Sequence, residues 1–225
     1  LGTTIANATS AKNLVLIGDQ MQLSQPIRAK HNGYARKSSL DFVLENLDTI
    51  PPEKGIFLNT TRRLNKKICK FISDSFYESR LTPHEEATSR SVKLKLDTIK
   101  DEGIFYVPID HIGCSQRSDE EADLIEKTYN KIIDKEFKVE DKEGQISPKD
   151  IMVVAPYNAQ ANNIRERLNK KYKDDVRVGT IDLFQGQEAK IVLISMTTSD
   201  VESLPRHKDF FFSRNRLNVA ISRAQ

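Results

Sequence analysis

The sequence predicts an α/β protein with an open, mostly parallel sheet flanked by helices. Short β-branched apolar runs alternate along the chain with stretches in which apolar residues recur every three or four positions. The first pattern is typical of buried strands in a parallel sheet, and the second is typical of amphipathic helices. Strands are predicted at residues 13–17, 55–58, 104–107, 151–154 and 190–196. In this class of fold, ligands bind beside the carboxyl ends of the strands.

Helices are predicted between these strands from the spacing of apolar residues. The helical patterns occupy residues 64–77, residues 118–137, a stretch that ends near residue 171, and residues 213–224. Ile68 and Ile72 share one face of the first helix because they lie one helical turn apart. Ser118 and Glu121 have the spacing of a capping box at the start of the second helix. The apolar faces of these helices are predicted to be core.

Composition sets outer limits on the class of protein. The chain has 225 residues, of which 38% are hydrophobic, so it can bury a core in one domain or in one domain plus part of another. The net charge of +3 permits a polyanionic partner without requiring one. Cys69 and Cys114 fit neither a metal site nor a disulfide framework, and the sequence carries no long apolar run and no signal peptide. The histidines lie scattered in polar loops, as His31, His84, His111 and His207. We therefore expect a cytoplasmic protein with no membrane partner and no metal ligands in this chain.

Polar residues follow three predicted strands at the point where each strand ends. Gln22 lies in the loop after the first strand, residues 156–158 follow the fourth, and residues 180–188 follow a short strand that ends at Gly179. Because parallel strands present their carboxyl ends at one edge of a sheet, these side chains are predicted to face the same way. Together with Arg223 they predict a cleft for a phosphorylated ligand.

The last predicted helix carries arginines that its packing does not require. Leu217, Val219 and Ile221 supply its buried side. Arg216 and Arg223 lie seven positions apart, about two helical turns, and so project from nearly the same side. Guanidinium groups placed in this way suit a phosphate. A basic surface helix that ends the domain is the alternative interpretation.

Four segments, in this order, resemble motifs of superfamily 1 helicases. Residues 18–23 resemble motif III, residues 58–65 with residues 76–78 resemble motif IV, residues 180–188 resemble motif V, and residues 216–224 resemble motif VI. Each motif alone is moderately specific, whereas the ordered set covers nearly the whole chain. The resemblance is to the 5′-to-3′ branch that includes the RNA-surveillance helicase of nonsense-mediated decay and the replication nuclease-helicases. Bacterial helicase modules that follow a RecB-like nuclease are similar as well, which implies such a fusion here.

The resemblance implies a RecA-like P-loop NTPase fold in two parts. Residues 1–54 would be the end of the first RecA-like domain, with motif III and the crossover. Residues 55–225 would be the second RecA-like domain, with motifs IV to VI and a surface loop or insertion around residues 82–103. The Walker A loop and the Walker B acidic pair of the family are absent, and residues 33–38 lack the spacing of a P-loop. We therefore expect a fragment that is inactive alone, with ATP and Mg²⁺ bound by the intact protein and the Mg²⁺ ligands outside this chain.

The resemblance also implies roles on the nucleotide side of the cleft. Gln22 would sense the γ-phosphate, and Arg63 and Arg223 would meet it from across the interdomain gap, with Arg223 as an arginine finger. Fixed guanidinium groups stabilise the charge that builds on the γ-phosphoryl oxygens during transfer. The implied nucleotide-binding residues are Gln22, Arg63, Gly186, Glu188, Arg216 and Arg223. Arg62 stands where the family has an aromatic residue, and we interpret it as a solvated residue at a helix start.

On the other side of the cleft, the resemblance implies a grip on single-stranded DNA or RNA by Pro156, Tyr157, Asn158 and Thr180. Main-chain N–H groups and the Thr180 hydroxyl can bond phosphate oxygens without reading a base sequence. Tyr157 would either stack on a base or a sugar or pack as a capping residue. The sequence does not decide between DNA and RNA.

Two other classes of function stay open at this point. One is an ATP-independent nucleic-acid-binding module that positions a fused nuclease, although such a module has no use for γ-phosphate sensors such as Gln22 and Arg223. The other is a doubly wound nucleotide-binding domain for signalling or small-molecule chemistry. It lacks support because no Gly-x-Gly-x-x-Gly follows a strand and no receiver-like acidic triad is present.

Overall fold

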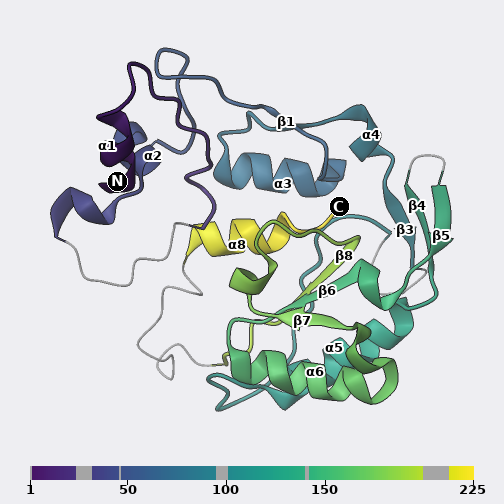
Figure 1. Cartoon of the computed structure of the whole chain (residues 1–225). Coiled ribbons are helices and arrows are strands. Elements are labelled where there is room, and N and C mark those ends of the chain that lie inside the picture. Colours follow the sequence, from purple (N-terminus) through teal and green to yellow (C-terminus); the bar gives the residue numbers. More distant parts are fainter. Residues whose placement is uncertain (1, 24–31, 46, 95–100, 140–141, 200–212) are drawn as a thin grey trace.

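A small parallel sheet forms the centre of the computed structural model, which describes residues 2–23, 32–45, 47–94, 101–139, 142–199 and 213–225. Strand β6 (Ile151–Val154) lies between β7 (Arg177–Gly179) and β8 (Ile191–Ile194), and both neighbours run parallel to it. Figure 1 shows this sheet between two groups of helices. The α/β class is therefore confirmed, and the strands predicted at 151–154 and 190–196 are present, the second one shorter than expected.

Both faces of β6 are buried, because alternate residues point to opposite faces of a strand. Ile151 and Val153 pack with the helices α5 (Asp119–Ile132) and α6 (Asn158–Tyr172) on one face. Met152 and Val154 pack with helix α8 (Arg214–Ile221) on the other. Helix α3 (Lys66–Phe76) lies beside α8 on that second face (Figure 1). The result is the helix, sheet, helix layering expected of a buried parallel sheet.

Helix α5 begins as predicted but ends five residues early and lacks the predicted capping box. The Ser118 hydroxyl accepts from the Glu121 N–H at 3.1 Å. The Glu121 carboxylate does not return to Ser118, because the Ser118 N–H donates to the buried Gln160 amide oxygen at 2.9 Å. After Ile132 the chain turns at Asp134, which has a φ of 64°, and enters a strand.

Two short strands and a short helix occupy the region around residues 82–103 that was predicted as a surface loop or insertion. Residues 82–102 contain β2 (Thr82–Pro83), α4 (Glu85–Thr88) and β3 (Ser91–Lys93). Strand β3 pairs with β4 (Glu136–Val139), which forms a hairpin with β5 (Lys142–Gln145). The segment around residues 82–103 is therefore not a plain loop, because cross-strand pairing can order a polar segment that has no clear hydrophobic period.

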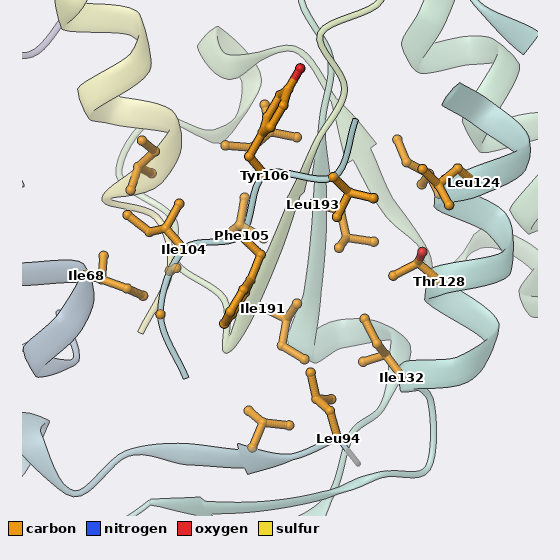
Figure 2. A pocket seen from close by; sticks show the side chains of 18 of the residues that line it. Ile68, Leu94, Ile104, Phe105, Tyr106, Leu124, Thr128, Ile132, Ile191 and Leu193 are labelled. Atoms are coloured by element: carbon orange, nitrogen blue, oxygen red, sulfur yellow. The ribbon is translucent and has the colours of Figure 1, made fainter. Parts of the chain in front are cut away.

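Three of the predicted strands do not form. Residues 13–17 and 55–58 pair with no strand among the described residues, and the pairing shifts to β1 (Thr60–Thr61), which runs parallel to β2. Residues 104–107 lie in a cavity of about 750 Å³ without joining the sheet. Figure 2 shows Ile104, Phe105 and Tyr106 in this cavity with Ile191 and Leu193 of β8. A β-branched run predicts a strand only where a neighbour offers its edge.

The remaining elements of the described residues are short. They are α1 (Gly2–Ala8), α2 (Ser39–Leu44) and the 3₁₀ turns η1 (Gly33–Arg36), η2 (Pro148–Asp150), η3 (Lys173–Asp175) and η4 (Ile181–Phe184). Helix α1 buries none of its residues, and α2 buries only Leu44. These amino-terminal helices lie at one end of the molecule, beside α3 and α8 (Figure 1).

Candidate functional site

The carboxyl ends of β6, β7 and β8 meet at one edge of the sheet. The Ala155 N–H donates to the Gly179 carbonyl at 3.0 Å, and the Ser195 N–H donates to the Val154 carbonyl at 2.9 Å. These bonds extend the ladder past the last strand residues. The segments that leave the three strands therefore start side by side, as predicted for the second and third polar loops.

The residues predicted to bind single-stranded nucleic acid lie in two of these segments, after β6 and after β7. Pro156 is buried, Tyr157 is the N-cap of α6, and Asn158 is the exposed first residue of that helix. Thr180 is the half-buried N-cap of η4 and its hydroxyl caps nothing there. Burial raises the pKa of Tyr157, and a hydrogen bond with Thr198 partly offsets this. The edge thus presents hydroxyl, amide and main-chain donors, and it leaves Tyr157 compatible with both stacking and packing.

On the other side of α8, residues far apart in sequence form an arginine cluster of Arg63, Glu188 and Arg223. The Arg63 Nε donates to a Glu188 carboxylate oxygen at 2.6 Å, and an Arg63 amino group donates to the Ser222 carbonyl at 3.3 Å. The second Glu188 oxygen accepts from the Gln225 amide at 2.7 Å. Motifs IV, V and VI therefore converge, as the sequence predicted.

Arg223 is almost fully buried, with 2% of its surface exposed. Its guanidinium donates to the Val219 and Gln187 carbonyls, both at 3.1 Å. Burial lowers the pKa of Arg223, and the nearby positive charge of Arg63 lowers it further. Burial would raise the pKa of Glu188, but its hydrogen bond and ion pair with Arg63 outweigh this and lower it. Because two guanidinium groups lie near a single carboxylate, which pairs with Arg63, the cluster has an excess of positive charge that favours an additional anion.

A third arginine, Arg90, belongs to the same region and was missed by sequence reasoning. An Arg90 amino group donates to the Arg63 carbonyl at 2.6 Å, and its charge contributes to the low pKa of Glu188. Its buried Nε has no hydrogen-bond partner within the described part of the chain. Arg90 lies in a polar stretch without periodicity, so no sequence pattern distinguished it from a surface arginine.

The remaining predicted nucleotide residues lie around this cluster in different settings. Arg216 forms an ion pair with Asp182 at 3.2 Å, so it faces the same segment as Arg223 but contacts a different residue. Gly186 is exposed and has a φ of 79°, a conformation that favours glycine. Arg62 is 69% exposed and pairs only with Glu86 among the described ion pairs. This supports its interpretation as a solvated residue.

Gln22 lies at the end of α8 that is nearer the amino-terminal region. Its amide donates to Asp19 at 2.8 Å, and Asp19 accepts from the Tyr77 hydroxyl of α3 at 2.6 Å. Tyr77 is close enough to Arg223 for its charge state to affect the pKa of that arginine. The structure thus brings the first polar loop, which carries Gln22, to the border of the arginine cluster rather than into it.

A buried carboxylate, Glu121, orders the exit of β8 and was missed by sequence reasoning. It accepts from the main-chain N–H groups of Met196 and Thr197 at 2.9 and 2.7 Å, and from the Ser195 hydroxyl at 2.5 Å. His111 lies 3.1 Å from the same carboxylate, and both side chains are buried. The only sequence signal was the capping-box spacing, which points Glu121 at the wrong partner.

Within the described residues, no three His, Cys, Asp or Glu side chains come together as metal ligands. His31 and His207 lie outside the described residues, and His84 caps α4. None of the described helices combines the length and the apolar character that a membrane span requires.

Comparison with known proteins assigns the class that this fold and site define. A family model described as an AAA domain matches residues 37–225. The chain therefore belongs to this AAA-domain family, which agrees with the RecA-like α/β fold and with the helicase motifs quoted above.

Individual relatives carry helicase names. The chain is 32% identical to DNA polymerase alpha-associated DNA helicase A of Schizosaccharomyces pombe, over 93% of this chain and 32% of the relative. It is 27% identical to the protein of the same name in Saccharomyces cerevisiae, over 97% of this chain and 34% of the relative. It is 29% identical to an uncharacterised ATP-dependent helicase of Methanocaldococcus jannaschii, over 95% of this chain and 31% of the relative. The chain thus spans about a third of the length of these relatives, two from yeasts and one from an archaeon.

Proposed function

We propose that this chain is the carboxy-terminal part of an ATP-dependent superfamily 1 helicase or translocase that moves on single-stranded nucleic acid. The observation that carries the proposal is the convergence of Arg63, Glu188 and Arg223 beside α8, with the strand exits of Tyr157 and Thr180 on the same sheet. An anion site next to a row of phosphate-binding donors suits a motor that couples a nucleotide to a strand. The DNA helicase names of two relatives favour single-stranded DNA over RNA as the strand.

On the nucleotide side, the residues present fit a terminal phosphate. ATP, held with Mg²⁺ by residues outside this chain, supplies the phosphoryl group whose transfer releases energy. Arg63 and Arg223 would bind its oxygens, because the cluster has two guanidinium groups and a single carboxylate. Glu188 would orient Arg63 through their 2.6 Å hydrogen bond. Arg223 would act as the arginine finger, already oriented by the Val219 and Gln187 carbonyls.

On the strand side, Thr180, Asn158 and the first N–H groups of α6 would hold phosphate oxygens. The first turn of a helix has N–H groups without intrahelical partners, and its dipole favours negative charge. Because none of these groups reads a base edge, binding would be independent of base sequence. Tyr157 would add stacking on a base or a sugar.

The partners of this proposal are the preceding RecA-like domain in the same polypeptide and a single-stranded nucleic acid. We also propose the 5′-to-3′ branch and a RecB-like nuclease fusion of the bacterial type, both from the motif resemblance alone, and a cytoplasmic location, from composition alone. The presence of such a nuclease is tested by the sequence that precedes Leu1 in the complete protein.

The test uses a polypeptide extended to include the preceding RecA-like domain. Arg223→Ala should lower strand-stimulated ATP hydrolysis by about 10³-fold or more, the range of an arginine finger. Strand affinity should change by less than about 2-fold, because Arg223 does not lie at the strand exits. Since Arg223 is buried, Arg63→Ala provides a second variant, and Arg62→Ala is the matched control on the neighbouring exposed arginine.

Two outcomes would contradict this assignment. Retention of turnover by both Arg63→Ala and Arg223→Ala would remove the arginine cluster from the ATP site. Robust turnover by residues 1–225 alone would contradict the partial site.

A separate experiment tests the nucleic-acid side. Thr180→Ala combined with Asn158→Ala should weaken binding of single-stranded DNA and reduce its dependence on salt. Unchanged binding would exclude that surface.

The second candidate is an ATP-independent nucleic-acid-binding module that positions a fused nuclease. One observation favours it, namely that the Arg223 guanidinium is buried and bonded to main-chain carbonyls, as a purely structural arginine would be. This candidate requires strand binding by the extended polypeptide with no ATP turnover. Strand-stimulated ATP turnover by the unmodified extended polypeptide separates the two, because the second candidate binds the nucleic acid without hydrolysing ATP.

A further inference from the structure

A polar cluster of Asp19, Gln22, Tyr77 and Asn218, here called the aspartate cluster, joins the loop of motif III to the helices α3 and α8. One Asp19 carboxylate oxygen accepts from the Tyr77 hydroxyl at 2.6 Å and from the Gln22 amide nitrogen at 2.8 Å. The other accepts from the Met21 N–H at 2.9 Å. Asp19 is thus held by three donors that come from the loop and from α3.

Asn218 fixes the same cluster from α8. It is fully buried, and its amide nitrogen donates to the Met21 carbonyl and to the Tyr77 hydroxyl, both at 2.9 Å. One turn earlier on the helix, the Asn215 amide donates to the Gln20 and Gln22 carbonyls, both at 2.7 Å. Two asparagines of one helix therefore hold the main chain of the loop that carries Gln22.

The Tyr77 hydroxyl has a defined role in this arrangement. Burial, followed by the negative charge of Asp19, raises the pKa of Tyr77, so the hydroxyl keeps its proton. It donates that proton to Asp19 and accepts from Asn218. A carboxylate without a proton can only accept hydrogen bonds, so the hydrogen bond between the two side chains runs from the Tyr77 hydroxyl to Asp19.

The same property of Asp19 decides which end of the Gln22 amide faces the cleft. A carboxylate repels the amide oxygen and attracts the amide nitrogen, so the nitrogen of Gln22 must face Asp19. The Gln22 side chain also lies close enough to Tyr77 to lower the pKa of that tyrosine, against the larger effects of burial and Asp19. With its amide nitrogen held by Asp19, Gln22 presents its carbonyl oxygen away from that carboxylate.

We propose that Asp19, held by Tyr77 and Asn218, is a positioning residue that fixes the Gln22 amide with its nitrogen toward α3 and its carbonyl oxygen toward the nucleotide. This inference rests on the proposed function, because it gives Gln22 a nucleotide to face. Asn218 lies in α8, and Arg223 follows the end of that helix and donates to its Val219 carbonyl, so the same helix positions the Gln22 amide and the buried arginine. Tyr77 and Asn218 act through Asp19 and need no contact with the nucleotide.

The test is a double-mutant cycle in the polypeptide that includes the preceding RecA-like domain. Tyr77→Phe removes only the hydroxyl, and it should lower kcat of ATP hydrolysis on single-stranded DNA by about 3- to 10-fold, the value of one hydrogen bond. KM for ATP and the affinity for the strand should stay within about 2-fold. In the Gln22→Ala background, Tyr77→Phe should have no further effect on kcat, because the proposed route through the Gln22 amide has been removed.

Two further variants separate positioning from stability. Tyr129→Phe is the matched control, since Tyr129 is equally buried and its hydroxyl only approaches the Pro148 carbonyl at 3.5 Å, so kcat should not change. Asp19→Asn keeps the size of the side chain but allows the Gln22 amide to turn over, and it should lower kcat as Tyr77→Phe does. This variant serves if Tyr77→Phe fails to fold.

The proposal is overturned if the effects of Tyr77→Phe and Gln22→Ala multiply, if Tyr129→Phe lowers kcat equally, or if Asp19→Asn has wild-type kcat. Absence of strand-stimulated turnover in the unmodified polypeptide would refute the proposed function and this inference together. Turnover with multiplicative effects would refute only the positioning role.

Discussion

Two apolar runs with nearly the same sequence pattern have opposite environments in this molecule. Residues 151–154 form β6, and Val153 at its centre is fully buried between two neighbouring strands. Residues 13–17 have the same β-branched character, yet Val15 is 78% exposed and Ile17 is 89% exposed. Both runs are well suited to strands. The difference between them is that only one has neighbours in the described chain.

This comparison separates the propensity of a run from its pairing. A strand contributes to stability through cross-strand contacts and through burial of its faces, and neither exists for an isolated run. The amino-terminal run has no such contacts among the described residues, and its apolar side chains stay exposed. The preceding RecA-like domain of the proposed helicase would supply such contacts.

The largest difference between the two runs is expected when a charge is placed at the centre of each. Val153→Asp should lower the free energy of unfolding by more than about 4 kcal/mol, because it buries an unpaired carboxylate. Val15→Asp should change it by less than about 0.5 kcal/mol, because its side chain is exposed. Urea denaturation of residues 1–225 measures both. Equal effects of the two substitutions would mean that residues 13–17 are paired in solution.

An intermediate loss of stability is expected when a carboxylate that accepts main-chain hydrogen bonds is replaced by an amide in each region. Glu121→Gln should destabilise the chain by about 2 to 3 kcal/mol, because an amide cannot satisfy all the donors at the β8 exit. Asp41→Asn, in the capping box of α2, should cost less than about 1 kcal/mol. Urea denaturation again gives the comparison, with the exposed Glu120→Gln as the control for Glu121. A smaller cost at Glu121 than at Asp41 would contradict the buried network.

The smallest expected effect is a loss of stability at acidic pH, and it should come from Asp119 at the start of α5, which packs on the central sheet. Hydrogen bonds from Arg117 and Arg167 lower the pKa of Asp119 from 3.8 to about 2. A lowered pKa means that its stabilising effect is complete above pH 3.8 and is lost as the pH falls toward about 2. Asp119→Asn should therefore flatten the loss of stability in that window.

The amino-terminal control for this measurement is Glu53→Gln, since Glu53 is exposed. It should leave the slope of stability against pH unchanged. Urea midpoints at several acidic pH values give both slopes. The same slope for wild type and Asp119→Asn would show that the ion pairs of Asp119 add nothing to stability.

Sequence reasoning succeeded where local pattern and topology agree. The runs at 151–154 and 191–194 contain the expected strands, and the parallel topology places Tyr157 and Thr180 at one edge. The approach of Arg63 to Glu188 was also predicted, although these residues are 125 positions apart. Ordered motifs carry such long-range information because each one belongs to a known place in the fold.

Sequence reasoning failed where a residue is defined by a distant partner that no pattern encodes. Glu121 has the spacing of a capping residue, but its partners lie 74 to 76 positions later at the end of β8. Arg90 lies in a polar stretch that gained order only by pairing with β4. The run at 104–107 failed for the opposite reason, because its pattern is clear while the edge beside it was left unpaired.

The segment after α8 determines how force would pass through this part of the proposed helicase. The Ala189 N–H donates to the Arg223 carbonyl at 2.9 Å, and the Gln225 N–H donates to the Ala189 carbonyl at 3.0 Å, in a parallel bridge. A pull along residues 222–225 loads both bonds in shear, so they must break together rather than one after the other. The load continues through the Glu188 carbonyl to Arg177 of β7, at 3.1 Å. Helix α8 is thus mechanically anchored to the central sheet, and a displacement of the helix is transmitted to the sheet as a unit.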